Sequence, residues 1–204
     1  KGCEVIDLNG QYLMPGLINL HVHIPAGGKP TGKPMDARRS VKLATSNALT
    51  RKYIEYMYKS YCRTELYSGV TTFRSVGGIE NYDTWIRDLI LSGKATGPRI
   101  LAANMAISVP GGHMAGSLAY EATTPREAAE YVRKIAEDKP NLIKLMITGG
   151  VLDATVKGEP GVLKMEPDMV KSACDEAHRL GFHVAAHVES PQGMQVALEN
   201  GVDT

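Results

Sequence analysis

The chain has 204 residues, 43% of them hydrophobic and 22% charged, and a formal net charge of +1, so we expect no nucleic-acid partner and no attraction to an acidic membrane surface. Its three cysteines form no C-x-x-C pair, no signal-peptide pattern opens the sequence, and no apolar run is long enough to span a bilayer. These features favour a cytoplasmic protein with reduced thiols and one large domain, with room for a small appendage.

The first predicted element is a β-hairpin around Asn9-Gly10, because both residues tolerate a positive φ and apolar runs flank them. Strands and helices alternate after it. The strands are predicted at residues 18–24, 69–76, 98–107, 142–148 and 183–188. The helices are predicted at residues 36–67, 82–91, 124–138, 167–180 and 190–201. The loops are predicted at residues 25–34, 110–113 and 152–164.

This alternation predicts an α/β fold with a parallel sheet and right-handed crossovers. Its unbroken repetition favours a (β/α)₈ TIM barrel over a doubly wound sheet, and the chain carries about five of the eight βα units of such a barrel. Neither a G-x-G-x-x-G motif nor a P-loop follows any predicted strand, which weakens a nucleotide-binding alternative. Barrel chemistry is expected at the C-terminal ends of the strands.

The first strand of the barrel carries a His-x-His pair, His21 and His23, within an apolar run. Alternation along a strand places both imidazoles on one face. Two imidazoles at the end of a strand can bind one metal ion from one side. The alternative is a half-exposed antiparallel strand with two surface histidines.

Lys144 lies in the middle of an otherwise apolar strand. If the face with Ile143, Leu145 and Ile147 meets the helices, Lys144 points into the barrel. A buried ammonium must be paired or neutralised, so one alternative is a salt bridge to an inward acid. The other is a carbamate, formed when carbon dioxide adds to the neutral amine, which can bridge two divalent metal ions.

Two further histidines lie at the functional end of the predicted barrel. His187 ends the fifth strand, and His113 lies in a glycine-flanked loop after the third. For His113, a substrate contact and a loop-bracing role are equally consistent with the sequence. His183 starts its strand at the opposite end and His178 lies on a helix, so structural roles are expected for both.

The sequence resembles the metal-dependent amidohydrolase superfamily, most closely its imidazolonepropionase-like and prolidase-like branch, which includes Xaa-Pro and Xaa-Arg dipeptidases. The matching motifs cover nearly the whole chain in the family's order. They are residues 14–23 (MPGLINLHVH), 69–74 (GVTTFR), 97–99 (GPR), 111–113 (GGH), 143–150 (IKLMITGG) and 184–187 (VAAH).

The resemblance implies a site with one or two divalent ions, expected to be zinc. His21 and His23 would bind the more buried ion, carboxylated Lys144 would bridge the two ions, and His187 would bind the second. His113 is the candidate substrate contact. Residues 1–13 resemble the end of a small β-sandwich domain beside the barrel, and residues 14–204 resemble a partial metal-dependent hydrolase barrel.

The sequence also departs from the family pattern. The family has a further ligand histidine about one strand later, and a metal-binding aspartate at the last strand that acts as general base; we expect both beyond Thr204. Ser75 follows Arg74 where this branch often has aspartate. About half of an active site is therefore present, and we expect the 204-residue chain alone to lack activity.

The implied reaction is hydrolysis of an amide or cyclic amide C–N bond, in a dipeptide or imidazolone-type substrate, by a metal-activated hydroxide. Superfamily members that cleave lactones, deaminate or decarboxylate are alternatives. A different hypothesis is an incomplete, non-catalytic fragment that binds a metal or ligand, because three further strands are needed to close the barrel. The expected partners are a small-molecule or dipeptide substrate and further copies of the chain in a homo-oligomer.

Overall fold

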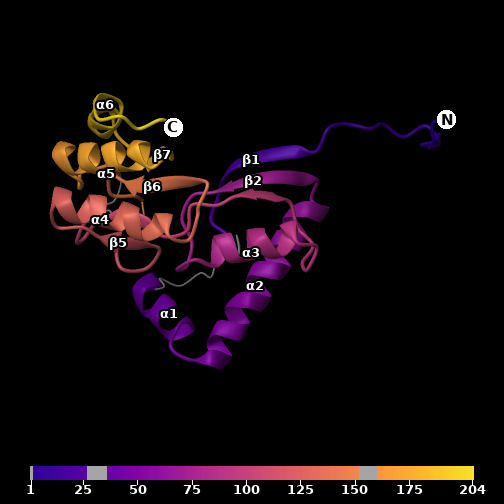
Figure 1. The fold of residues 1–204 in the computed structure, drawn as a ribbon, viewed down its shortest axis with the longest axis horizontal. Helices are drawn as coiled ribbons and strands as arrows, with labels where there is room; N and C mark the ends of the chain where they lie inside the picture. Colours follow the sequence, from indigo (N-terminus) through magenta and orange to yellow (C-terminus); the bar gives the residue numbers. More distant parts are fainter. Residues whose placement is uncertain (1, 27–35, 152–159) are drawn as a thin grey trace.

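A computed structural model describes residues 2–26, 36–151 and 160–204 (Figure 1). The predicted loop residues 27–34 and 152–159 lie outside the described part of the chain. The strands are β1 (Leu17–Val22), β2 (Val70–Ser75), β3 (Arg99–Leu101), β4 (Ala106–Ser108), β5 (Ala119–Glu121), β6 (Leu142–Met146) and β7 (His183–His187). The helices are α1 (Ala37–Ala44), α2 (Ala48–Tyr67), α3 (Tyr82–Leu91), α4 (Pro125–Ala136), α5 (Pro167–Arg179) and α6 (Pro191–Glu199).

The named strands form two parallel sheets, in the orders β1-β2-β3 and β5-β4-β6-β7. The two sheets follow one another along the chain, because β3 belongs to the first and β4 to the second. Within β7, Ala186 donates a backbone hydrogen bond to the Thr204 carbonyl at 2.9 Å, so the end of the chain lies alongside β7. The strands are parallel, β5 alone lies out of sequence order, and helices connect β1 to β2, β2 to β3, β5 to β6 and β6 to β7, which confirms the predicted α/β fold as part of a (β/α)₈ barrel.

Most helices begin at the side chains that the sequence offers as caps. Asp36, Asn47, Thr124 and Ser190 each accept a hydrogen bond from a backbone amide of the first turn that follows. At the start of α4, the Glu127 carboxylate also accepts hydrogen bonds from the amide and hydroxyl of Thr123.

The predicted helix over residues 36–67 is wrong in one respect, because it is two helices, α1 and α2 (Figure 1). The Thr45 hydroxyl donates to the carbonyl of Val41 at 2.9 Å, and the helix ends there. Asn47 then starts α2 with a capping box shared with Thr50. An N-cap residue inside a continuous apolar stripe therefore marks the boundary between two helices, which the apolar periodicity alone does not reveal.

The predicted strand over residues 98–107 is also split, into β3 and β4, which belong to different sheets. Asn104 lies between them with a φ of 63°, a left-handed conformation that cannot continue a strand. β5 was not predicted, because its three residues carry too short a pattern; it pairs with β4 in parallel register.

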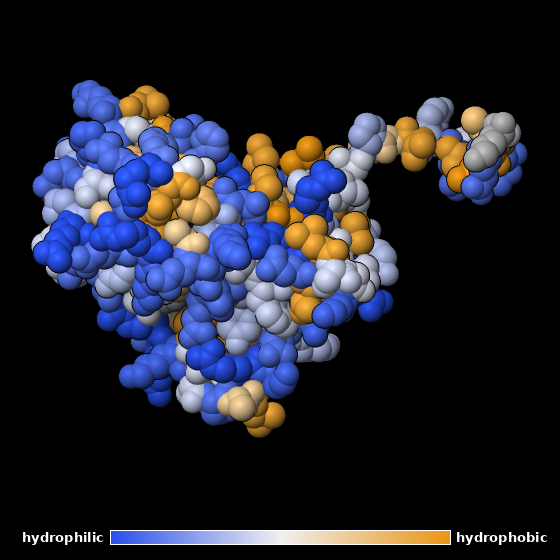
Figure 2. All heavy atoms as spheres, in the orientation of Figure 1, coloured by the Kyte–Doolittle hydropathy of each residue, from blue (hydrophilic) through white to orange (hydrophobic). Residues whose placement is uncertain are grey.

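The predicted N-terminal hairpin does not form among residues 2–16. Asn9 and Gly10 do adopt positive φ values of 49° and 81°, and Gln11 donates to the Leu8 carbonyl at 3.0 Å, so the turn exists. No strand flanks it in this described stretch, whose side chains are exposed on an arm that extends from the body (Figures 1 and 2). The assignment of residues 1–13 to a β-sandwich stays a prediction.

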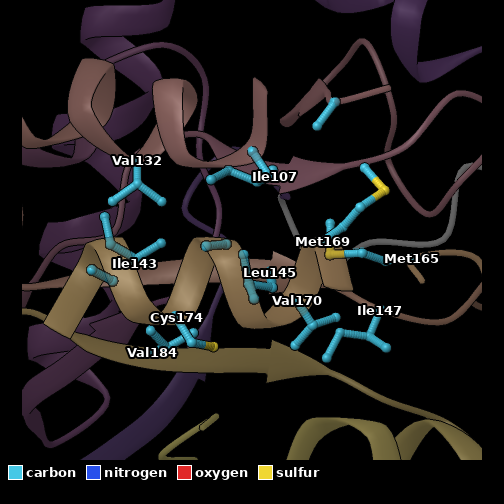
Figure 3. Packing of buried hydrophobic residues seen from close by; sticks show 14 of the residues in the cluster. Ile107, Val132, Ile143, Leu145, Ile147, Met165, Met169, Val170, Cys174 and Val184 are labelled. Atoms are coloured by element: carbon cyan, nitrogen blue, oxygen red, sulfur yellow. The ribbon is translucent and has the colours of Figure 1, made fainter. Parts of the chain in front are cut away.

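The larger core cluster lies between the second sheet and helices α4 and α5 (Figure 3). Ile143, Leu145 and Ile147 on β6 and just after it are fully buried against these helices, and each contributes roughly 2 kcal/mol of hydrophobic free energy. A second cluster packs the first sheet against α2 and α3.

The opposite face of β6 points into the partial barrel. Leu142 packs there with Val76, Ala103 and Ala185, and Met146 packs with Ala106 and Ala119. Lys144 shares this parity, so the face predicted for it is confirmed. No helix in the described residues is long and apolar enough to cross a membrane.

Candidate metal centre

The two histidines of the His-x-His pair point at one another. The Nε2 atoms of His21 and His23 are 3.3 Å apart, and the rings meet edge to face with centroids 5.2 Å apart. Two nitrogens bound to one tetrahedral zinc ion at about 2.05 Å would be separated by roughly 3.3 Å. The pair therefore fits two ligand positions of one metal ion.

His23 is oriented by the backbone of the next strand's loop. Its Nδ1 donates to the carbonyl of Gly77 at 2.9 Å, which leaves the lone pair on Nε2 directed at His21. Metal-binding histidines usually donate their second ring nitrogen in this way, because the bond selects the tautomer and fixes the ring. Gly77 has a φ of 141°, and a β-carbon there would lie 3.2 Å from the His23 ring.

The electrostatic environment keeps both imidazoles neutral, which is the form that binds metal. Partial burial and the positive charge of Lys144 lower the pKa of His21 to about 4. Burial also lowers the pKa of His23, with Lys144 acting in the same direction and the bond to Gly77 opposing it. Both rings can therefore bind a cation at pH 7 without first losing a proton.

Lys144 is 1% exposed on β6. Burial, reinforced by the positive charge of Arg74, lowers the pKa of its amine to about 8. No carboxylate forms a salt bridge with it in residues 2–26, 36–151 and 160–204. The salt-bridge alternative therefore has no partner in the described part of the chain.

His187 and His113 form a second pair. Their rings stack with centroids 4.1 Å apart and planes 16° from parallel. His187 Nε2 lies 3.4 Å from the Glu189 carboxylate and 3.5 Å from the Gly149 carbonyl. Burial lowers the pKa of His187, and its electrostatic interactions with His113 and Lys144 lower it further.

The predicted site residues thus form two contacting pairs, with Lys144 interacting electrostatically with His21, His23 and His187. His113 also acts on His23, which joins the two pairs. Within the described ranges, no three histidine, cysteine, aspartate or glutamate side chains converge as a complete metal site. The ligand roles of these residues stay a prediction.

Three residues of this region were not predicted. Gly77 supplies the carbonyl for His23, Glu189 faces His187, and Gly150 lies against the His113 ring, where a β-carbon would be 2.5 Å from Nδ1. The glycines follow the ends of strands, as expected for close backbone approach, but sequence spacing does not show which ring each one meets.

The placement of His183 and His178 agrees with the structural roles expected for them. Both contact the carboxylate of Asp203, at 3.4 and 2.9 Å respectively. His183 is the first residue of β7 and His187 the last, so this cluster lies at the opposite end of the strand from the candidate site.

The profile of the Amidohydrolase family matches residues 12–204. The chain belongs to this family. Among solved structures, it is similar to an amidohydrolase with a TM-score of 0.79 and 26% identity, over 98% of this chain and 49% of that one. No curated protein sequence matches the chain.

Two other similar structures carry peptidase names. A putative prolidase from Bifidobacterium longum is 34% identical, with a TM-score of 0.70 over 93% of this chain and 39% of that one. A Xaa-Pro dipeptidase, solved with methionine bound in its active site, is 28% identical with a TM-score of 0.68, over 93% of this chain and 47% of that one. The chain therefore spans at most about half the length of these structures. Their names agree with the prolidase-like branch predicted from the sequence.

Proposed function

We propose that the whole protein containing this chain is a metal-dependent hydrolase that cleaves an amide or cyclic amide C–N bond. The observation that carries this proposal is the 3.3 Å separation of the His21 and His23 Nε2 atoms, with His23 already oriented by Gly77. Imidazole nitrogens at this spacing suit zinc, and membership of the amidohydrolase family supports hydrolysis.

The proposed ligands are His21 and His23 for one ion and His187 for a second. Lys144 would bridge the two as a carbamate: its neutral amine adds carbon dioxide and loses a proton, which converts a cation into an anionic oxygen ligand. Its lowered pKa, about 8, supports this step because a larger fraction of the amine is neutral near physiological pH. Bound there, a divalent ion would lower the pKa of a water molecule and polarise the scissile carbonyl.

The proposed substrates are dipeptides, with small cyclic amides as the related class. The similarity to a Xaa-Pro dipeptidase and to a putative prolidase supports the dipeptide assignment. His113 is proposed to contact substrate, because it stacks on His187 and so places a polar ring beside the second metal position. A homo-oligomer and a cytoplasmic location are also proposed; the free state of all three cysteines supports the location.

The test uses the whole protein, purified with its metal content measured by elemental analysis and assayed with panels of Xaa-Pro and Xaa-Arg dipeptides and cyclic amides. We expect bound zinc or another divalent ion, turnover of at least one amide class, loss of turnover on chelation, and recovery when metal and bicarbonate are restored. His178→Ala is the matched control for His21→Ala, because His178 contacts Asp203 at the other end of β7.

Two results would contradict the proposal. Metal-free protein with undiminished turnover would exclude a metal-dependent mechanism. Metal bound with no turnover of any amide, lactone or amine substrate would favour the non-catalytic binding hypothesis.

A further inference from the structure

The segment that presents the Gly77 carbonyl to His23 is held by three hydrogen bonds to partners on other parts of the chain. Val76 donates its amide to the Val22 carbonyl at 3.0 Å, and Gly78 donates to the Asn104 carbonyl at 2.9 Å. Ile79 donates to the hydroxyl of Tyr58 at 3.1 Å. The three amides that donate these bonds lie within two residues of Gly77, so the Gly77 carbonyl has little freedom to turn away from His23.

A buried polar network lies directly behind this segment. Tyr58, Ser75 and Asp83 are each 0% exposed, and the Ser75 hydroxyl donates to the Asp83 carboxylate at 2.6 Å. Tyr58 and Asp83 interact electrostatically, each affecting the pKa of the other. The backbone of Gly78 packs on the same carboxylate: a β-carbon at Gly78 would lie 2.1 Å from Asp83 Oδ1.

The metal chemistry proposed above makes no direct use of this network, and hydrophobic packing alone does not account for it. Burying a carboxylate and a phenol is unfavourable unless their interactions offset the loss of water. Both groups come from outside the barrel strands, Tyr58 from α2 and Asp83 from the first turn of α3. They converge on the loop whose Gly77 carbonyl accepts the hydrogen bond from His23 Nδ1.

We infer that Tyr58 and Asp83 are positioning residues for the metal ligand His23, acting through the loop that carries Gly77. Tyr58 fixes the amide of Ile79, and Asp83 packs on Gly78 while binding Ser75 at the end of β2. Together they hold the Gly77 carbonyl where it accepts the Nδ1 proton of His23. This inference rests on the proposed function, because it concerns a ligand of the proposed metal site.

The first test measures the zinc dissociation constant of the whole protein by competition with a chromophoric chelator. Tyr58→Phe removes only the hydroxyl, and we expect it to weaken zinc binding by about 10-fold, the lower end of the range for groups that orient a ligand histidine. Tyr82→Phe is the matched control. Its ring lies 5.6 Å from that of Tyr58 in the same cluster, but its hydroxyl interacts with Arg51 while the Ile79 amide is bound by Tyr58, so no comparable change is expected.

A double-mutant cycle tests whether the effect passes through His23. In a His23→Ala background, we expect Tyr58→Phe to cause no further loss of zinc affinity. A general loss of structure would weaken binding in both backgrounds. If Tyr58→Phe does not fold, the zinc dissociation constant and the double-mutant cycle are measured with Asp83→Asn, which preserves the shape of the side chain.

The outcomes separate this inference from the proposed function. If His23→Ala weakens zinc binding but folded Tyr58→Phe and Asp83→Asn bind zinc as the wild type does, the positioning role is wrong and the metal site stands. If Tyr58→Phe weakens zinc binding equally in the wild-type and His23→Ala backgrounds, the positioning role is also wrong. If His23→Ala leaves zinc binding unchanged, the proposed metal site is wrong and the inference is wrong with it.

Discussion

Replacing Lys144 by methionine should stabilise the metal-free protein while removing the proposed bridging ligand. The ammonium is 1% exposed, and burial lowers its pKa from 10.5 to about 8. At about 1.4 kcal/mol per pH unit, this difference corresponds to about 3 kcal/mol by which the folded state disfavours the charge. Methionine has a similar length and carries no charge, so Lys144→Met should increase the free energy of unfolding by about that amount at pH 7.

The sign of the pH dependence follows from the same shift. Below pH 8 the amine is charged in both the folded and unfolded states, and the full unfavourable contribution is present. Between about pH 8 and 10.5 only the folded state loses the proton, so the wild type gains stability as the pH rises. The advantage of Lys144→Met should therefore shrink from about 3 kcal/mol at pH 7 to about 1 kcal/mol at pH 9.5.

The assay is urea unfolding of the metal-free whole protein in bicarbonate-free buffer at the two pH values. Lys171→Met is the control, since Lys171 is exposed and pairs with Asp175 on the surface of α5, where an ion pair contributes less than about 1 kcal/mol. If Lys144→Met instead destabilises the protein at pH 7, with no dependence on pH, Lys144 is paired with an acid and the reasoning is refuted.

Three further predictions concern the candidate site and the Asp203 cluster at the other end of β7. His23→Ala should lower kcat/KM by roughly 100-fold or more, with bound metal reduced in elemental analysis, and unchanged metal content would contradict its role as a ligand. Gly150→Ala should raise KM with metal content unchanged, because its β-carbon would lie 2.5 Å from His113 Nδ1 and displace that ring; an unchanged KM would exclude His113 as a substrate contact. Asp203→Asn should destabilise the protein at pH 7. Burial raises the pKa of Asp203, but hydrogen bonds from the Val184 amide and His178 more than offset this, so the pKa is lowered. The difference in unfolding free energy between Asp203→Asn and the wild type should therefore vanish as the pH falls through the pKa of Asp203 in the folded protein. A difference that persists in acid would show that the charge of Asp203 is not responsible.

Much of the fold follows from local patterns in the sequence. Alternating or continuous apolar residues predicted β1, β2, β6 and β7 within one or two residues of their observed bounds. The same parity placed Lys144 inside the barrel and paired His21 with His23 on one face. Such statements depend only on neighbours along the chain, which the sequence displays directly.

Element breaks were less predictable, since they depend on single residues that compete with a continuing pattern. Thr45 ends α1 and Asn47 begins α2 within one apolar stripe, and Asn104 separates a single apolar run into strands of two sheets. The N-terminal turn at Asn9-Gly10 formed as expected, yet its flanking residues make no ladder, because turn chemistry alone does not supply a partner surface for two short strands.

The supporting contacts of the site were decided by the tertiary structure alone. His23 finds its acceptor 54 residues away at Gly77, His113 stacks on His187 across 74 positions, and the Tyr58 hydroxyl on α2 accepts from the amide of Ile79 in the loop after β2. The sequence identifies residue types that can bind metal, because that capacity belongs to the side chain. Which backbone carbonyl orients a ring, and which buried hydroxyl holds that carbonyl, depends on how strands and helices distant in the chain pack together, and no local pattern records it.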